Sequence, residues 1–192
     1  MKTPFAFLLL FFIVLLGCKN NQQAEETTPS NTTLTETSSS NKGQAFIEQE
    51  EGSTPNALQL ALGSKDHTTL VAAVQAAGVE NALVNVGPLT VFAPTNAAFD
   101  KLPKETLEDL LKPENKDKLA MILKHHVAPS NYPLETLEKN VEKNRDLYMA
   151  SGQYLPVTKD GSVIKVNGIK VGEPIKVSNG WVYVIDEVIL PN

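Results

Sequence analysis

The stretch Thr90-Val-Phe-Ala-Pro-Thr-Asn-Ala-Ala-Phe99 does the most to decide the fold of this 192-residue chain. Leu89 to Ala93 is a short run of strand-forming residues, and Pro94 is expected to end it because proline has no N–H group to donate to a sheet. Thr95 can then cap a helix, since its hydroxyl can accept a hydrogen bond from a backbone N–H group of the first turn. Asn96 is interpreted as a second residue of this turn and cap. The stretch therefore predicts a strand that passes directly into a short helix.

A second decisive segment, Asn179 to Pro191, lies near the C-terminus. Successive side chains of a strand point to opposite faces of its sheet, which places Trp181, Tyr183 and Ile185 on one face and two valines on the other. Both faces of this strand are therefore largely apolar. We predict that it lies in the interior of a β-sandwich, in which the C-terminal hairpins fold back around the strand that contains Phe92.

Three dipeptides with turn chemistry separate short runs rich in Val and Ile. They are Asp160-Gly161, Asn167-Gly168 and Asn179-Gly180. Such pairs tolerate positive φ at both central positions of a tight hairpin turn. Three of them in close succession predict a meander of short strands.

Other apolar residues recur with helical spacing. One helix is predicted to have Thr54 as its N-cap and Pro55 as its first residue, and a second is predicted to be capped by Asp66 and to end at Gly78. Each of these two helices has one apolar face, so both are expected to pack against the rest of the domain. Further helical segments are predicted at residues 107–111 and 116–124.

The N-terminus has the features of an export signal with a lipid attachment site. Lys2 precedes an unbroken apolar run from Phe5 to Leu16, which is too short to span a bilayer but suits the apolar core of a signal peptide. Gly17 and the sole cysteine, Cys18, follow in a sequence that resembles the bacterial lipobox. We therefore expect residues 1–17 to be a lipoprotein signal peptide and Cys18 to carry a diacylglycerol that anchors the protein to a membrane.

Residues 18–51 are predicted to be a disordered polar tether, and residues 52–192 the folded domain. The tether is rich in Asn, Gln, Thr, Ser and Glu, a composition that cannot offset the entropy lost on ordering. Within it, Gln23-Ala-Glu-Glu26 resembles a surface-export signal of lipoproteins from some outer-membrane bacteria. Both the periplasmic face and the cell surface are therefore open as locations. The net charge of −5, without a run of Lys or Arg, argues against a nucleic-acid partner.

Three segments, in this order and spacing, resemble the motifs of the fasciclin domain, also called FAS1. They are Gly87 to Phe99, Lys124-His-His-Val127 and Asn179 to Pro191. The resemblance implies an α+β fold, a compact wedge of two β-sheets with several helices packed along one edge, and a role in adhesion at cell surfaces or in extracellular matrix. His125 stands where the family has a tyrosine, which weakens a receptor-binding role for that segment. The residues carried over as structural or interaction positions are Thr90, Phe92, Pro94, Thr95, Asn96, Phe99, His126, Asn179, Gly180 and Asp186.

The groups suited to catalysis or metal binding are few. The three histidines, His67, His125 and His126, are candidate metal ligands because neutral imidazole is a common one. Adjacent residues on a strand point to opposite faces, so His125 and His126 are not expected to share one ion, and no cluster of Cys, Asp or Glu accompanies them. His126 is instead expected to be buried and hydrogen bonded. Asp186 is interpreted as an acceptor of backbone hydrogen bonds, and Ser151 as a loop residue outside any nucleophile elbow. We expect no metal, no cofactor and no catalytic residue, and hence no enzymatic function.

Two functions follow from these observations. The leading hypothesis is a lipid-anchored adhesion or interaction module of the bacterial cell envelope, on the outer membrane, with a cell-surface or matrix protein or a glycan as its partner. The alternative is a binder of a small apolar ligand between helices and sheet, since a few fasciclin-domain proteins carry pigments. A colourless domain that releases nothing on organic extraction would argue against this alternative.

Overall fold

A computed structural model describes residues 52–84 and 87–191 of the chain. The predicted signal peptide, Cys18 and the predicted tether lie outside the described residues, so the assignments of 1–17 and 18–51 stay predictions. Within the two described ranges, none of the helices combines the length and the apolar character that crossing a bilayer requires.

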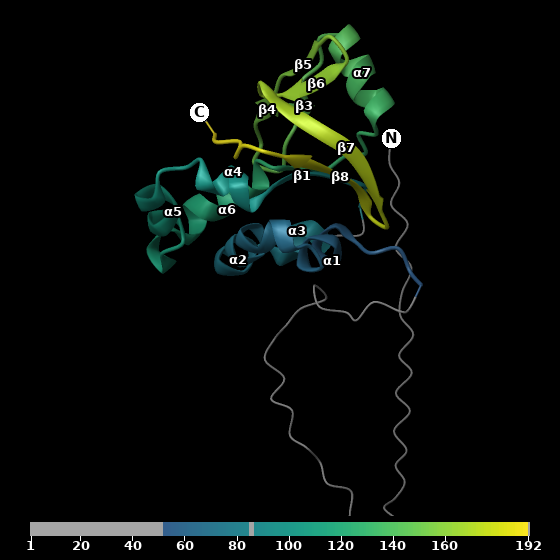
Figure 1. The fold of residues 1–192 in the computed structure, drawn as a ribbon. Coiled ribbons are helices and arrows are strands. Elements are labelled where there is room, and N and C mark those ends of the chain that lie inside the picture. The colour runs from purple at the N-terminus through teal and green to yellow at the C-terminus, as the bar shows by residue number, and fades with distance from the viewer. Residues whose placement is uncertain (1–51, 85–86, 192) are drawn as a thin grey trace, which may run out of the picture. The chain divides into compact units, whose positions relative to one another are not determined.

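The main sheet has six strands in the order β2-β1-β8-β7-β6-β5 (Figure 1). β1 and β8 pair in parallel, from Leu89 with Gly180 to Pro94 with Ile185, whereas the other neighbours in this sheet are antiparallel. The two segments that decide the fold therefore lie side by side. β3 and β4 form a separate two-stranded sheet. The strands are β1 Leu89–Pro94, β2 Val127–Ala128, β3 Leu147–Tyr148, β4 Tyr154–Leu155, β5 Val157–Asp160, β6 Val163–Val166, β7 Ile169–Val177 and β8 Gly180–Ile185.

Strands β5 to β8 form the predicted meander, with antiparallel pairing throughout. At Asn167-Gly168 both residues have positive φ, 51° and 82°, as predicted. The prediction is wrong for the other two pairs. Asp160 still belongs to β5, and Gly180 is the first residue of β8, so Ser178 and Asn179 form the β7–β8 turn. Gly180 belongs to the strand because it pairs with the start of β1.

The central strands bury side chains on both faces, as predicted. Val91 and Val182 lie in an apolar cluster with helices α1 to α6, whereas Phe92 and Tyr183 lie in a second cluster with α7, β3 and β4. Figure 1 shows α1 and α2 on one side of β1 and β8, and α7, β5 and β6 on the other. The rings of Phe92 and Tyr183 stack with their centroids 5.7 Å apart. The predicted packing of the C-terminal strands around Phe92 and the α+β class are thus confirmed.

The helices lie partly where the sequence predicts them. The segment 116–124 is confirmed, the helix predicted at 107–111 starts three residues earlier, and α3 and α7 are additional. The α-helices are α1 Ala57–Leu62, α2 Thr68–Ala77, α3 Glu80–Val84, α4 Asn96–Asp100, α5 Lys104–Leu110, α6 Lys116–Lys124 and α7 Leu134–Glu142, with short 3-10 helices at Lys65–His67 and Pro113–Asn115.

The predicted N-caps of the first two helices are wrong. Asn56, not Thr54, caps α1, because its side chain accepts a hydrogen bond from the Gln59 N–H group and the Gln59 side chain accepts one from the Asn56 N–H group, each at 2.9 Å. Asp66 lies inside a 3-10 turn that Ser64 caps. This turn precedes α2, which has no side-chain cap from its own N-terminal residue.

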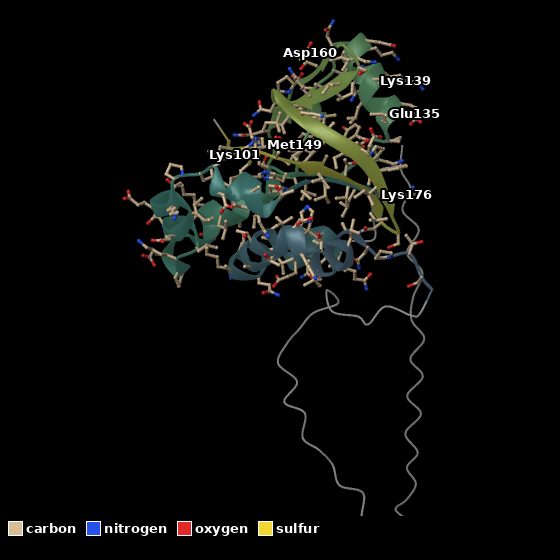
Figure 2. The ribbon with its side chains drawn as sticks, viewed as in Figure 1. Lys101, Glu135, Lys139, Met149, Asp160 and Lys176 are labelled. Carbon is tan, nitrogen blue, oxygen red and sulfur yellow. The ribbon has the colours of Figure 1, made fainter. Side chains whose placement is uncertain are left out.

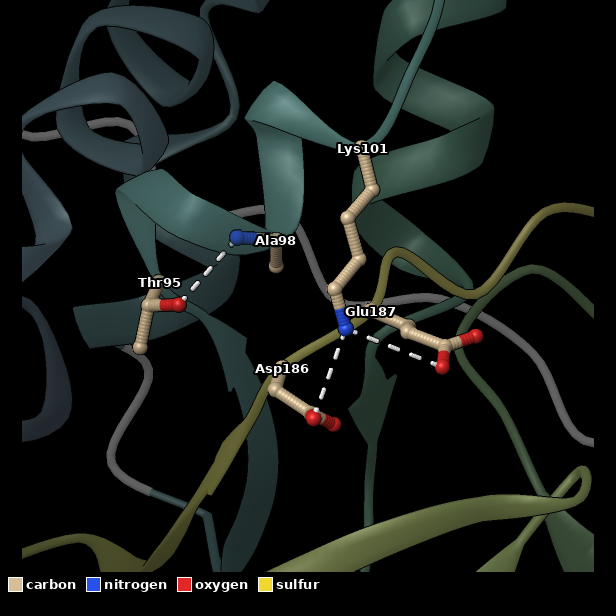
Figure 3. A network of polar contacts seen from close by, with 5 residues as sticks. All are labelled: Thr95, Ala98, Lys101, Asp186 and Glu187. Atoms are coloured by element: carbon tan, nitrogen blue, oxygen red, sulfur yellow. Dashed lines mark hydrogen bonds and ion pairs between the residues drawn. The ribbon is translucent and has the colours of Figure 1, made fainter.

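Two other predicted helix ends are confirmed. Thr95 caps α4, since its hydroxyl accepts a hydrogen bond from the Ala98 N–H group at 3.2 Å (Figure 3). Gly78 ends α2 with φ of 64°, a left-handed conformation that a residue with a β-carbon adopts at a cost.

Candidate functional site

Asn96 connects the end of β1 to the start of α2. Its Oδ1 atom accepts hydrogen bonds from the Thr69 N–H group at 2.9 Å and the Thr68 hydroxyl at 3.2 Å. Its Nδ2 atom donates to the Lys65 carbonyl at 3.0 Å. Asn96 therefore supplies the cap that α2 lacks locally, rather than serving its own turn as predicted.

Asn179 has a matching role at the other end of the central strand pair, just before β8. Its Oδ1 atom accepts a hydrogen bond from the Ala57 N–H group at 3.0 Å, and its Nδ2 atom donates to the Leu83 carbonyl at 2.8 Å. The Asn179 carbonyl accepts a further bond from the Leu89 N–H group at 2.9 Å. One side chain thus holds the start of α1 and the end of α3 against the sheet.

Gly180 is required by the close approach of β8 to β1. Its φ is +149°, and a β-carbon built there would overlap the carbonyl oxygen of Leu89. The family-motif glycine is therefore a packing requirement of the parallel strand pair.

Thr90 and Tyr183 anchor the loop between β2 and α7. The buried Thr90 hydroxyl donates to the Ser130 carbonyl and accepts from the Tyr132 N–H group, both at 2.9 Å. The Tyr183 hydroxyl donates to the Tyr132 carbonyl at 2.8 Å. Burial raises the pKa of Tyr183, with the carboxylates of Glu135 and Glu173 acting in the same direction.

Phe92, Pro94 and Phe99 contribute to packing. Phe92 is fully buried in the cluster next to α7, Pro94 is the last residue of β1, and Phe99 is buried among the helices on the opposite face. On the Phe92 face, the Nζ atom of Lys176, labelled in Figure 2, lies 4.5 Å from the centroid of the Trp181 ring, which fits a cation–π contact.

His126 is buried and hydrogen bonded, as predicted. Its Nδ1 atom lies 2.8 Å from the Ile122 carbonyl, to which it donates, and its Nε2 atom accepts from the Ile189 N–H group at 2.9 Å. This pair of partners requires the neutral ring with its hydrogen on Nδ1. Burial lowers the pKa of His126 to about 4; the hydrogen bond to Ile122 opposes this shift and the neighbouring His125 adds to it. His126 therefore joins the end of α6 to the C-terminal segment.

The two adjacent histidines do not lie on a strand, so the geometric reason given from the sequence is wrong. Both follow α6 in a turn. His125 is also buried, and its Nδ1 atom lies 2.8 Å from the Ser151 hydroxyl, which is a different partner from the two that His126 binds. Burial lowers the pKa of His125. Sequence reasoning missed this contact, because Ser151 is 26 residues away.

Asp186 is exposed and forms an ion pair, which contradicts its predicted role as an acceptor of backbone hydrogen bonds. Figure 3 shows Lys101 between Asp186 and Glu187. The Lys101 Nζ atom lies 3.4 Å from Asp186 and 3.8 Å from Glu187, and the side chain of Asp186 is 68% exposed. Asp186 lies beyond the end of β8, where water reaches it, so the ion pair contributes little to stability.

A small cavity lies between α1, α2, α3 and the sheet. Its volume is about 80 Å³, and most of its lining is apolar. Two polar side chains take part in the lining, Ser64 and His67, whose Oγ and Nδ1 atoms are 2.8 Å apart. The lining residues are Ala57, Leu60, Ala61, Ser64, His67, Leu70, Leu83, Val91, Ala93, Ile175, Val182 and Val184.

The described side chains bring together no group of three or more His, Cys, Asp or Glu residues suited to a metal ion. The predicted motif residues themselves divide into two sets. Asn96, Asn179, Thr90 and His126 bind other parts of the same domain, whereas Asp186 reaches solvent. The arrangement is suited to holding helices on a sheet, and the cavity of about 80 Å³ is a separate feature between those helices and the sheet.

Comparison with known proteins gives relatives in bacteria and animals. Protein sll1483 of Synechocystis is 38% identical over 159 residues, which cover 82% of this chain and 86% of that protein. Immunogenic protein MPB70 of Mycobacterium bovis is 37% identical, over 68% of this chain and 66% of that protein. Human periostin is 32% identical over 66% of this chain, which spans 15% of periostin. None of these three names is that of an enzyme.

The fold has a solved counterpart. A FAS1 domain pair of the insect cell adhesion molecule Fasciclin I matches with a TM-score of 0.65 and 18% identity, over 72% of this chain and 52% of that chain. The family model described as the Fasciclin domain matches residues 65–191, which extend from the turn before α2 to the end of the described region. The chain therefore belongs to the fasciclin domain family.

Proposed function

We propose that this chain is a lipid-anchored, non-catalytic adhesion or interaction module of the bacterial cell envelope. The observation that carries the proposal is that the polar side chains of the fasciclin motifs are engaged inside the domain. Asn96 and Asn179 hold helices, and Thr90 and His126 hold loops. Groups held in this way are not available to react with a substrate, so a partner would meet the outer surface.

The anchor and location belong to the same proposal. Cys18 would carry the lipid, and the domain would stand on the outer membrane, at the periplasmic face or at the cell surface. Protease treatment of intact cells separates these two locations, because loss of the domain requires exposure to the medium. Cys18→Ser is the matched variant, since it removes the acceptor thiol and should release the protein from the membrane fraction. A Cys18→Ser protein that stays membrane-bound would refute the anchor.

A pair of exposed aromatic rings supports a contact surface on the β3–β4 ribbon. Tyr148 and Tyr154 are opposite each other in register, with ring centroids 5.3 Å apart, and are 46% and 65% exposed. Exposed tyrosines combine a large apolar face with a hydroxyl, which suits both protein and glycan partners. We propose that this pair, which we call the tyrosine ribbon, takes part in adhesion.

The test is attachment of cells that display the protein. Cells that lack the gene should attach or aggregate less than cells that carry it. Restoring the double variant Tyr148→Ser, Tyr154→Ser should give less attachment than restoring the natural chain. Met121→Ser is the matched control, because Met121 is equally exposed, at 46%, but lies on α6. If the double variant attaches as well as Met121→Ser, the tyrosine ribbon is refuted. If cells without the gene attach as well as cells that carry it, the adhesive function is refuted.

A second candidate function is the binding of a small apolar ligand between helices and sheet. The cavity of about 80 Å³ is the specific observation that favours it. Extraction of the purified chain with organic solvent, followed by mass spectrometry, tests whether a ligand is carried from the cell.

A further inference from the structure

The cavity restricts the size of any guest. A cavity needs roughly 10–15 Å³ to hold one water molecule, and a cavity of about 150 Å³ can hold benzene. The cavity here, at about 80 Å³, lies between these limits. It arises where α1 presents the small side chains of Ala57 and Ala61 to the valines of β1 and β8. A guest of a few carbon atoms fits inside, whereas a pigment does not.

One wall of the cavity carries a polar group without a partner. His67 is 9% exposed, and its Nε2 atom is buried and has no hydrogen-bond partner among the described residues. The Ser64 hydroxyl can donate its hydrogen to Nδ1 of His67, 2.8 Å away, while its oxygen accepts a hydrogen bond from the Asp66 N–H group at 3.3 Å. This assignment places the ring hydrogen on Nε2.

The surroundings keep this ring neutral. Burial lowers the pKa of His67, while the Asp66 carboxylate and the backbone of Ala93 oppose the shift in part. The Ala93 backbone, in the same cavity wall, does not meet the geometry of a hydrogen bond to Nε2. A buried N–H group without an acceptor is unfavourable, and an incoming oxygen atom would relieve it.

We propose that this cavity binds a short aliphatic molecule that carries one acceptor oxygen, with the carbon chain among Ala61, Leu70 and Val182 and the oxygen accepting a hydrogen bond from His67 Nε2. This inference rests on the second candidate function and names the chemical class of its ligand. Ile175, a cavity residue on β7, is 38% exposed, so the lining reaches the surface there. The hydroxyl or carbonyl oxygen of the ligand determines which molecules the cavity prefers, and the cavity volume limits the length of the carbon chain.

Two probes of equal size test the proposal. Ethanol and propane each have three non-hydrogen atoms and differ in that a hydroxyl replaces a methyl group. Each is titrated into the purified full-length chain, and binding is followed by the methyl NMR signals of Leu70 and Val182. His67→Phe should weaken ethanol binding about fivefold, the loss of one hydrogen bond, while propane binding changes less than twofold. The His67→Phe substitution changes the size of the ring for both probes alike, so the ratio of the two affinities reports the hydrogen bond.

Filling the cavity is the second perturbation. Ala61→Leu should abolish binding of both probes, and Ile175→Phe, placed at the exposed mouth, provides the same test in a protein whose helices are unchanged. If propane binds and His67→Phe leaves the ratio of the ethanol and propane affinities unchanged, the polar anchor is refuted but ligand binding stands. If neither probe shifts the cavity signals, or if Ile175→Phe and Ala61→Leu leave binding unchanged, the cavity is not a binding site and both proposals fail.

Discussion

Acidification from pH 7 to pH 5 should destabilise this domain through His126. The neutral ring donates to the Ile122 carbonyl and accepts from the Ile189 N–H group. Protonation puts a hydrogen on Nε2, which then faces a donor and loses its bond to Ile189. The folded-state pKa, about 4, is below the unfolded value of 6.5, so unfolding takes up a proton between these values. The stabilising contribution is complete above pH 6.5 and is lost as the pH falls toward 4.

The size of the effect follows from the shift in pKa. A separation of about 2.5 pKa units corresponds to ~3 kcal/mol between the two protonation states, which is the full loss below pH 4. At pH 5 the loss is ~2 kcal/mol, because most unfolded molecules are protonated there and most folded ones are not. His125 and His67, whose pKa values burial also lowers, act in the same direction. The contribution of His126 to the pH dependence of stability must therefore be measured by comparison with a variant that lacks this ring.

The assay is urea unfolding followed by the fluorescence of Trp181, the single tryptophan, at several pH values between 4.5 and 7.5. His126→Gln is the non-titrating variant, since its amide can donate to Ile122 and accept from Ile189. The free energy of unfolding of the natural chain should fall more steeply below pH 6.5 than that of His126→Gln. Parallel curves for the two proteins, or a His126 pKa above 6 measured by NMR in the folded state, would refute the reasoning.

Four further substitutions test contacts within the domain, each by thermal or urea unfolding. Gly180→Ala should destabilise the domain by ~3 kcal/mol or more, because the new β-carbon overlaps the Leu89 carbonyl and β8 must move away from β1; a loss below 1 kcal/mol would show that the strands separate easily. Asn179→Ala and Asn96→Ala should each cost ~1–3 kcal/mol, since each leaves a helix N–H group and a carbonyl without the partner described here, and a neutral result at either site would mean that water replaces the amide. Lys101→Ala should change stability by less than ~0.5 kcal/mol because its ion pairs are exposed, so a larger loss would contradict the view that this network is marginal.

The parts of the fold that depend on neighbouring residues could be predicted from the sequence. The strand that ends at Pro94, the helix capped by Thr95 and the left-handed end of α2 at Gly78 all follow from chemistry within a few positions. The alternation of Trp181 and Tyr183 with valines also predicts a strand buried on both faces. In each case the signal and the structure it causes lie within one turn or one strand.

The errors occur where a nearby residue competes for the same role. Thr54 is an acceptable cap, but Asn56 stands closer to α1 and makes the bond. Asp66 lies inside a 3-10 turn that Ser64 caps, and the α2 N–H group of Thr69 is bound by Asn96 from a remote segment. α7 starts after Pro133 without a side-chain cap, so its start carries no capping signal of the kind used to find the other helices. His125 and His126 are expected on a strand, whereas α6 extends to Lys124 and both histidines lie in the turn that follows it.

The sequence by itself determined the class of domain, the positions of its main strand and turn signals and the family, because these depend on local residue types and their spacing. The tertiary structure alone decided that β1 pairs in parallel with β8, that Asn179 reaches Ala57 across 122 positions and that Gly180 has no room for a β-carbon. It also decided that the Nε2 atom of His67 lies in a cavity wall without a hydrogen-bond partner among the described residues. These features arise where segments that are far apart in the chain meet. The spacing of residues within one segment does not specify which other segment it contacts or how closely.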